Sequence, residues 1–224
     1  MKNAIILLSG GLDSTTTLFL AKHKGFRISC LIFDYGQRHR KEINAAKNVA
    51  RTARCPLTVV TIKLPWKGSA LLDKKISLPQ KRSLAKIGAA QIPVTYVPAR
   101  NIIFLSFAAS FAEGVGADTI FIGANARDYS GYPDCRPEFF KAYKKVLECA
   151  TKAGVEGRGV KIETPLIHKT KSQIIALGLK LKVPYQLTWS CYKGGRVPCG
   201  ICDSCILRKK GFSELGLEDP LSYD

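Results

Sequence analysis

The stretch that most constrains the fold is a glycine-rich turn near the amino terminus, Leu8-Ser9-Gly10-Gly11-Leu12-Asp13-Ser14-Thr15, directly after the apolar run Ala4–Leu7. The pattern predicts a buried strand, a tight turn, and a helix from Asp13 to about Lys24. Two adjacent glycines let successive backbone N–H groups point into one concavity, and the helix adds unpaired N–H groups and the positive end of its dipole. The segment therefore predicts a site for phosphate or pyrophosphate.

The spacing of this turn differs from the two common nucleotide-binding fingerprints. A Walker loop needs G-x-x-x-x-G-K-S/T and a dinucleotide fold needs G-x-G-x-x-G, whereas Gly10 and Gly11 are adjacent and no lysine follows. The string Ser-Gly-Gly-x-Asp-Ser resembles instead the PP-loop of ATP pyrophosphatases, which cleave ATP between the α- and β-phosphates. A turn without a ligand is the alternative, and the polar side chains of Ser9, Asp13 and Ser14 argue against it.

Apolar, β-rich runs alternate with helical patterns along the chain. The expected strands are Ala4–Ser9, Ile28–Asp34, Leu57–Lys63, Thr119–Gly123 and Lys161–Glu163. The expected helices are Asp13–Lys24, Arg38–Thr52, Ala99–Gly114, Glu138–Lys152 and Ser172–Leu181. This alternation predicts an α/β, Rossmann-like fold with a parallel sheet, helices on both faces, and ligands bound past the carboxyl ends of the strands. The glycine-rich turn and Asp34–Gln37 both follow strands and should share one crevice.

A chain of 224 residues fits one domain with a small appendage. We expect residues 1–185 to form an ATP-binding, catalytic domain, and residues 186–224 to form a zinc-binding module packed on it. Residues 64–98 are rich in proline, glycine, lysine and arginine and are too long for an idle connection. We predict that this segment is a mobile lid or a substrate loop.

The formal net charge is +18, which makes a nucleic-acid partner one hypothesis. Most of the basic residues are scattered singly, as on a solvated surface, and ATP with an anionic substrate also needs positive surroundings. No apolar stretch approaches the ~20 residues of a membrane-spanning helix, and the amino terminus has no signal-peptide pattern. We expect a cytoplasmic protein without a membrane partner.

Four of the eight cysteines have the spacing of metal ligands: Cys191, Cys199, Cys202 and Cys205. Four thiolates bind zinc tetrahedrally and leave no open position, so the site is expected to be structural. An iron–sulfur cluster could use the same four ligands. Four unrelated buried thiols are the weaker alternative. The other cysteines, at positions 30, 55, 135 and 149, lack such spacing.

Two further segments carry candidate ligand-binding residues. In Phe33–Arg40, the basic side chains of Arg38, His39 and Arg40 suit ATP phosphates, while backbone groups near Phe33 suit the adenine edge. An ordinary polar loop that opens a helix is the alternative. Val97–Asn101 places Arg100 and Asn101 at the start of a long apolar helix, where an anion and its donors would converge.

The segment Gly123–Glu138 suits a planar ligand that forms hydrogen bonds. A guanine-like edge offers two parallel N–H donors that one carboxylate can accept together. The candidate carboxylates are Asp128, Asp134 and Glu138, the candidate ring-covering side chains are Tyr129 and Tyr132, and the candidate cations are Arg127 and Arg136. A capped turn before the following helix is the alternative.

Taken together, these segments closely resemble the 7-cyano-7-deazaguanine synthase family of PP-loop ATP pyrophosphatases. The matching segments are Ser9–Thr15, Phe33–Arg40, Thr95–Asn101, Gly123–Phe139, Thr151–Glu156, Glu163–Ile167 and Trp189–Cys205. They cover nearly the whole chain, and residues 64–91 match least. The resemblance implies a ligase in which the carboxylate of 7-carboxy-7-deazaguanine attacks the α-phosphate of ATP, ammonia displaces AMP to give an amide, and a second ATP activates the amide so that loss of AMP leaves a nitrile.

The resemblance also implies roles for individual residues. The ATP-binding set would be Leu8, Ser9, Gly10, Gly11, Leu12, Asp13, Ser14, Thr15, Phe33 and Arg38. Within it, Ser9 and Ser14 would bind the leaving pyrophosphate, and Asp13 would help to hold Mg²⁺ with ATP as co-substrate. The candidates for binding 7-carboxy-7-deazaguanine are Arg100, Asn101, Asp128, Tyr129, Asp134 and Arg136.

The product would feed queuosine or archaeosine in tRNA, but the enzyme would act on the free base, so no nucleic acid is obligatory. The ammonia source and the oligomeric state, with a homodimer as one possibility, stay open at this point. A PP-loop tRNA thiolation enzyme is the alternative, and Cys135 is then the plausible sulfur carrier. A non-enzymatic zinc module that binds nucleic acid is a third reading, which leaves Gly10-Gly11 unexplained.

Overall fold

In the computed structural model, the described residues are 2–38, 40–87, 91–126 and 131–224. Their strands are β1 (Asn3–Leu7), β2 (Arg27–Asp34), β3 (Leu57–Thr61), β4 (Thr119–Ile122) and β5 (Lys161–Glu163). The helices are α1 (Leu12–His23), α2 (Lys41–Thr52), α3 (Leu84–Ile87), α4 (Arg100–Val115), α5 (Pro137–Ala150), α6 (Lys152–Val155), α7 (Lys171–Lys180) and α8 (Asp203–Ser213), with 3₁₀ turns η1 (Pro133–Cys135) and η2 (Tyr185–Leu187).

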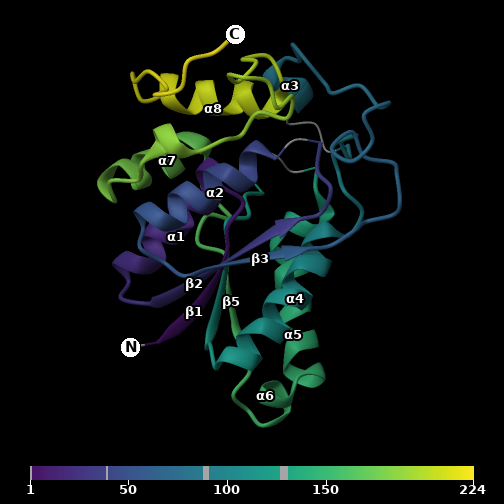
Figure 1. Cartoon of the computed structure of the whole chain (residues 1–224), viewed down its shortest axis with the longest axis vertical. Coiled ribbons are helices and arrows are strands. Elements are labelled where there is room, and N and C mark those ends of the chain that lie inside the picture. Colours follow the sequence, from purple (N-terminus) through teal and green to yellow (C-terminus); the bar gives the residue numbers. More distant parts are fainter. Residues whose placement is uncertain (1, 39, 88–90, 127–130) are drawn as a thin grey trace.

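The strands form one parallel sheet in the order β3-β2-β1-β4-β5 (Figure 1). This confirms the Rossmann-like α/β prediction, since the central strand β1 lies between β2 and β4, and the carboxyl ends of all five strands meet at one edge. Each predicted strand and helix is present with shifts of a few residues at its ends. α2 begins at Lys41 and not at Arg38, because the Gln37 side chain bonds to the backbone of Phe33 and Tyr35 and holds an irregular turn.

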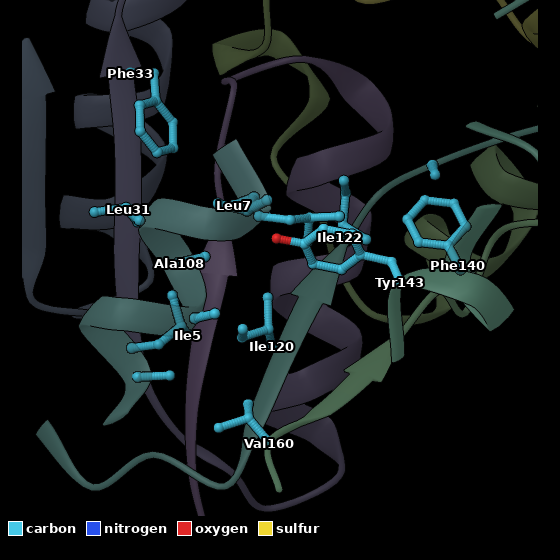
Figure 2. Packing of buried hydrophobic residues seen from close by; sticks show 14 of the residues in the cluster. Ile5, Leu7, Leu31, Phe33, Ala108, Ile120, Ile122, Phe140, Tyr143 and Val160 are labelled. Atoms are coloured by element: carbon cyan, nitrogen blue, oxygen red, sulfur yellow. The ribbon is translucent and has the colours of Figure 1, made fainter. Parts of the chain in front are cut away.

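Alternate residues of the strands feed two cores on opposite faces of the sheet. On one face, Ile5 and Ile120 are buried in one cluster with Ala108 of α4 and Tyr143 of α5 (Figure 2). On the other face, the neighbouring strand residues pack against α1 and α2. The members of that second core include Ile6, Cys30, Phe121, Leu18 and Val49. The helices therefore hold the sheet edge, and the turns that follow it, from both sides.

The carboxyl-terminal elements pack on α1. Buried Leu12 meets Ile174 of α7 and Phe212 of α8 in a third core. Tyr185 ties this layer together, because its hydroxyl bonds to Thr16 at 2.8 Å and to the carbonyl of Ile174 at 3.1 Å. The tail of the chain is thus brought over the start of α1, where the glycine-rich turn lies (Figure 1).

The long segment at 64–98 is anchored to the rest of the protein at several points. Leu71 and Val97 are buried in the core that faces α4. Gln80 forms an antiparallel bridge with Cys202, and the Arg82 guanidinium pairs with the buried carboxylate of Asp203. The described part of this segment therefore joins the sheet domain to the cysteine-rich tail. Its movement as a lid stays a prediction, and the domain boundary between residues 185 and 186 also stays a prediction.

Among the described residues, no helix is long and apolar enough to cross a membrane.

Candidate active site

A cavity of about 310 Å³ lies at the carboxyl ends of β1, β2 and β4. The glycine-rich turn and the residues that follow β2 line the same cavity, as the sequence predicted. Its lining includes Ser9, Gly11, Asp13, Ser14, Phe33, Tyr35, Glu42, Arg100, Asn101, Phe104, Tyr132, Cys135, Lys171 and Trp189. The glycine-rich turn and side chains of the expected substrate segment therefore face one space.

The glycine-rich turn is fixed by close packing and hydrogen bonds. Gly10 has φ +80°, and a Cβ there would lie 2.5 Å from backbone atoms of Ala46 and of Glu42. The Ser9 and Ser14 hydroxyls are 2.9 Å apart, and the Ser9 hydroxyl also accepts the N–H of Gly11 at 3.3 Å. The turn thus approaches α2 as only glycine allows, and it presents two hydroxyls with the first N–H groups of α1.

Asp13, at the start of α1, faces the amino end of α7. The Lys171 ammonium lies 2.8 Å from both of its carboxylate oxygens, and both side chains are largely buried. Sequence reasoning missed Lys171, because 158 positions separate it from Asp13 and no local pattern marks the pair. The pair puts a cation and a carboxylate beside the phosphate-binding turn, which suits the binding of phosphates with a metal ion.

The residues after β2 divide between two environments. The Phe33 ring stacks on Phe104 of α4 with ring centroids 4.0 Å apart, and it forms one wall of the cavity. Arg38 points elsewhere: its guanidinium donates to the carbonyls of Ala70 and Ile76, both at 3.1 Å. It is not among the cavity-lining residues, and it holds the 64–98 segment in place. His39 lies outside the described residues, and Arg40 pairs with Asp34 at 3.2 Å.

The amino end of α4 joins the cavity to the loop that precedes α5. Asp134 is buried and accepts the backbone N–H of Asn101 at 3.0 Å, while the Asn101 amide donates to the Asp134 carbonyl at 3.0 Å and to the Cys135 sulfur at 3.2 Å. Asp134 therefore fixes the start of α4, where Arg100 and Asn101 face the cavity. The Arg100 guanidinium donates to the Tyr35 hydroxyl at 3.1 Å.

The other substrate candidates fall outside this cavity or outside the described residues. Arg136 and Glu138 are exposed near the start of α5 and do not line the cavity. Asp128 and Tyr129, together with Arg127, lie outside the described residues.

Glu42, which sequence reasoning also missed, lies in the first turn of α2 and faces the cavity. Burial raises the pKa of its carboxyl to about 7, against the opposing effect of the nearby Arg100 guanidinium. An acidic residue in the first turn of a helix is ordinary, because it complements the helix dipole. The sequence therefore gave no reason to single it out.

The four clustered cysteines meet as the spacing predicted. Their sulfurs all lie within 4.8 Å of one another, and all four residues are buried. Hydrogen bonds from Cys202 and Cys205 hold the pKa of the Cys191 thiol well below its ordinary value. A tetrahedron of thiolates about 2.3 Å from one ion has edges of roughly 3.8 Å, so the cluster fits a single thiophilic metal ion. A four-iron cluster would need the thiolates farther apart.

The tail module is bound directly to the phosphate-binding turn. The Trp189 backbone N–H donates to the Gly10 carbonyl at 2.9 Å, and the Trp189 indole donates to the Cys191 carbonyl at 3.0 Å. Trp189 therefore links the cysteine cluster to the turn. Sequence reasoning placed Trp189 in a motif but gave it no such role.

Comparisons with known proteins agree with this geometry. The sequence model described as "Queuosine biosynthesis protein QueC" matches residues 3–216. Proteins named 7-cyano-7-deazaguanine synthase are 55% identical over 222 residues in Trichormus variabilis, covering 98% of this chain and 97% of that protein, and 52% identical over 223 residues in Thermoplasma acidophilum, covering 100% and 92%. Among solved structures, NMN synthetase from Francisella tularensis aligns with a TM-score of 0.51 at 15% identity, covering 97% of this chain and 78% of that chain.

The structural likeness supports the fold alone, because the sequence identity is low. The family match and the full-length relatives are a stronger finding, since each extends over both the sheet domain and the cysteine cluster. This chain therefore belongs to the QueC family of queuosine biosynthesis proteins, the family of the 7-cyano-7-deazaguanine synthases.

Proposed function

We propose that this chain is an ATP-dependent ligase that converts 7-carboxy-7-deazaguanine and ammonia to 7-cyano-7-deazaguanine. The observation that carries the proposal is the single cavity that joins the glycine-rich turn to Arg100, Asn101, Tyr132 and Cys135. An acyl adenylate can form only where the α-phosphate of ATP and a substrate carboxylate meet, and this cavity offers groups for both. The full-length relatives with the same activity in their names support the reaction class.

The reaction needs positioned charge and no protein nucleophile. As the substrate carboxylate attacks the α-phosphate, negative charge builds on the leaving pyrophosphate. The first backbone N–H groups of α1, with the Ser9 and Ser14 hydroxyls, would bind those oxygens, which the position of the turn on the cavity lining supports. The Lys171 ammonium adds a cation at the same end of the cavity. Ammonia then displaces AMP, and a second ATP repeats the activation on the amide oxygen.

Magnesium and zinc belong to the proposal as well. Asp13 offers two carboxylate oxygens at the phosphate-binding turn, a donor type that suits Mg²⁺, which would neutralise charge on the transferred phosphates. Zinc is assigned to the four-cysteine cluster, because four buried thiolates form a closed, tetrahedral donor set. That site has a structural role, since it leaves no open coordination position.

A tRNA thiolation enzyme is the runner-up, and the environment of Cys135 argues against it. A sulfur carrier reacts as a thiolate. Burial and the neighbouring Asp134 carboxylate raise the pKa of the Cys135 thiol to about 12, so it stays protonated near neutral pH. A thiol that stays protonated is unsuited to sulfur transfer.

The cellular setting completes the proposal. We place the enzyme in the cytoplasm, acting on the free base that later enters queuosine or archaeosine in tRNA.

A homodimer is supported by the exposed side of α4, where Ile102 and Phe107 are 41% and 43% exposed and no charged residue occurs from Asn101 to Ala112. An uncharged apolar face is complementary to itself, whereas a chain of net charge +18 would repel its copy across a basic face.

Product analysis tests the proposal. Purified protein with MgATP, ammonium and 7-carboxy-7-deazaguanine should yield the nitrile, detected by mass spectrometry, with two AMP and two pyrophosphate per nitrile. Accumulation of the amide alone would mean that the second activation fails in this chain. ATP cleavage that does not depend on the deazaguanine would contradict the proposed function.

A further inference from the structure

The described part of the cavity lining contains two carboxylates, those of Asp13 and Glu42. Asp13 lies at the phosphate end and is paired with Lys171 at 2.8 Å. Glu42 comes from α2 and acts electrostatically on the Arg100 guanidinium and the Tyr35 hydroxyl. Of the two carboxylates, Glu42 is therefore the one that lies near Arg100, at the amino end of α4.

Arg100 brings N–H donors to the same place. Its guanidinium carries five N–H groups, one of which donates to the Tyr35 hydroxyl at 3.1 Å. It also lies 5.8 Å from the centroid of the Tyr35 ring and 6.0 Å from that of Phe104. Tyr132, whose hydroxyl is 2.7 Å from that of Thr95, lines the cavity nearby. A carboxylate, a guanidinium and aromatic rings therefore surround one compartment.

The Watson–Crick edge of a guanine-type base presents an acceptor, O6, followed by two donors, N1–H and the 2-amino group. The complementary protein edge offers one donor followed by two acceptors, which Arg100 and Glu42 supply together. Resting on the proposed function, we infer that Glu42 accepts N1–H and the 2-amino group of 7-carboxy-7-deazaguanine through its two carboxylate oxygens, while Arg100 donates to O6. These two residues then determine the specificity for the guanine base.

Two other candidate carboxylates, those of Asp134 and Glu138, are less suited to this role. Asp134 uses a carboxylate oxygen to accept the Asn101 N–H and so fixes α4. Glu138 is exposed and does not line the cavity. The raised pKa of Glu42, about 7, agrees with a carboxylate that lines the cavity and is poorly solvated there.

The test compares two substrates in wild type and Glu42→Gln. One substrate is 7-carboxy-7-deazaguanine, and the other is the analogue that lacks only the 2-amino group. Substrate-dependent AMP formation is measured with MgATP and ammonium. Glu148→Gln is the matched control, because Glu148 is an exposed acid on α5 that pairs with Lys144 of the same helix. ATP affinity and thermal unfolding are measured for each variant to show that it is folded.

We expect wild type and the control to prefer the guanine substrate by about 10- to 100-fold in kcat/KM, the discrimination that one bidentate pair provides. Glu42→Gln should lose that preference, with a raised KM for the guanine substrate and an unchanged one for the analogue, because the glutamine N–H opposes the 2-amino group. An equal loss on both substrates, a loss confined to kcat, or an unaltered preference would overturn the inference. If wild type itself forms no AMP with the guanine substrate, the proposed function fails instead.

Discussion

At the scale of single residues, the active site depends on groups whose charge is set by burial. Glu42 is the clearest case, because its pKa lies near 7 and the ionised form is needed to accept two N–H groups. Among the residues that the structure describes, the Arg100 guanidinium of α4 and the Tyr35 hydroxyl after β2 interact electrostatically with it. Tyr35 keeps its proton, since burial raises its pKa above the ordinary value of 10.

The first prediction is therefore a pH dependence of substrate binding. In ATP–pyrophosphate exchange without ammonia, the kcat/KM for 7-carboxy-7-deazaguanine should rise about tenfold per pH unit below pH 7 and then level off. Glu42→Gln should show no such rise. A wild-type profile that is flat between pH 5.5 and 8, or a rise that persists in the variant, would assign the titration to another group.

The same shift affects stability with a definite sign. The pKa of Glu42 is raised from 4.5 in the unfolded chain to about 7 in the native protein, so the native state binds more protons between these values. The free energy of unfolding of the ligand-free protein should therefore fall as pH rises through this window, and less so in Glu42→Gln. Urea unfolding at pH 5 and pH 7.5 measures this fall in the free energy of unfolding. The same fall in wild type and in Glu42→Gln would contradict the prediction.

At the scale of elements, the strand–turn–helix at β1 and α1 depends on how closely Gly10 approaches α2. Gly10 and Gly25 have the same φ of +80°, but a Cβ at Gly10 would meet backbone atoms at 2.5 Å, whereas one at Gly25 meets nothing within 4 Å. Alanine substitutions at the two positions therefore distinguish two costs in stability. Both substitutions place a Cβ on a left-handed residue, but only the one at Gly10 adds a steric clash.

Gly25→Ala should lower the free energy of unfolding by about 1 kcal/mol, the cost of a left-handed residue with a Cβ. Gly10→Ala should cost about 1–3 kcal/mol more, because α2 must shift, and it should also weaken ATP binding. Urea unfolding and ATP titration measure both effects. Equal destabilisation of the two variants, with unchanged ATP affinity, would contradict the prediction, because it would show that a shift of α2 at Gly10 costs nothing.

The sequence predicted those features of the fold and the site that depend on neighbouring residues. The turn at Gly10-Gly11 and the cysteine spacing are local patterns, and the structure places the turn at the cavity and brings the four thiols together as predicted. Lys171 and Glu42 reach the cavity only through the packing of α7 and α2, so no local pattern marks them. For Arg38 the local pattern was misleading. Its positive charge suits an ATP phosphate, but in the folded chain its guanidinium donates to two carbonyls of the 64–98 segment.

At the scale of the whole molecule, the cysteine cluster is connected both to the glycine-rich turn and to the 64–98 segment. Trp189 connects it to Gly10 of the turn, and Asp203, next to Cys202, pairs with Arg82 of the 64–98 segment. The backbone N–H of Lys81 also donates to the Ile201 carbonyl at 2.8 Å. We therefore expect a metal ion in the cluster to order more than its own module.

Removing the metal should loosen both parts. Hydrogen–deuterium exchange of chelated protein, compared with metal-loaded protein, should increase at residues 8–14 and 78–86 as well as in the tail, but not in β4 or β5. Cys205→Ser should reproduce the change, and Cys149→Ser, at an exposed thiol, should not. An increase confined to residues 186–224 would mean that the module folds independently of the site.

The central claim is that a carboxylate oxygen of the substrate attacks the α-phosphate of ATP, and its most direct test follows that oxygen. With both carboxylate oxygens of 7-carboxy-7-deazaguanine labelled with ¹⁸O, turnover with MgATP and ammonium is analysed by mass spectrometry. One label should appear in each of the two AMP molecules formed per nitrile, and none in pyrophosphate. Unlabelled AMP, or label in pyrophosphate, would contradict attack at the α-phosphate and with it the account of the active site.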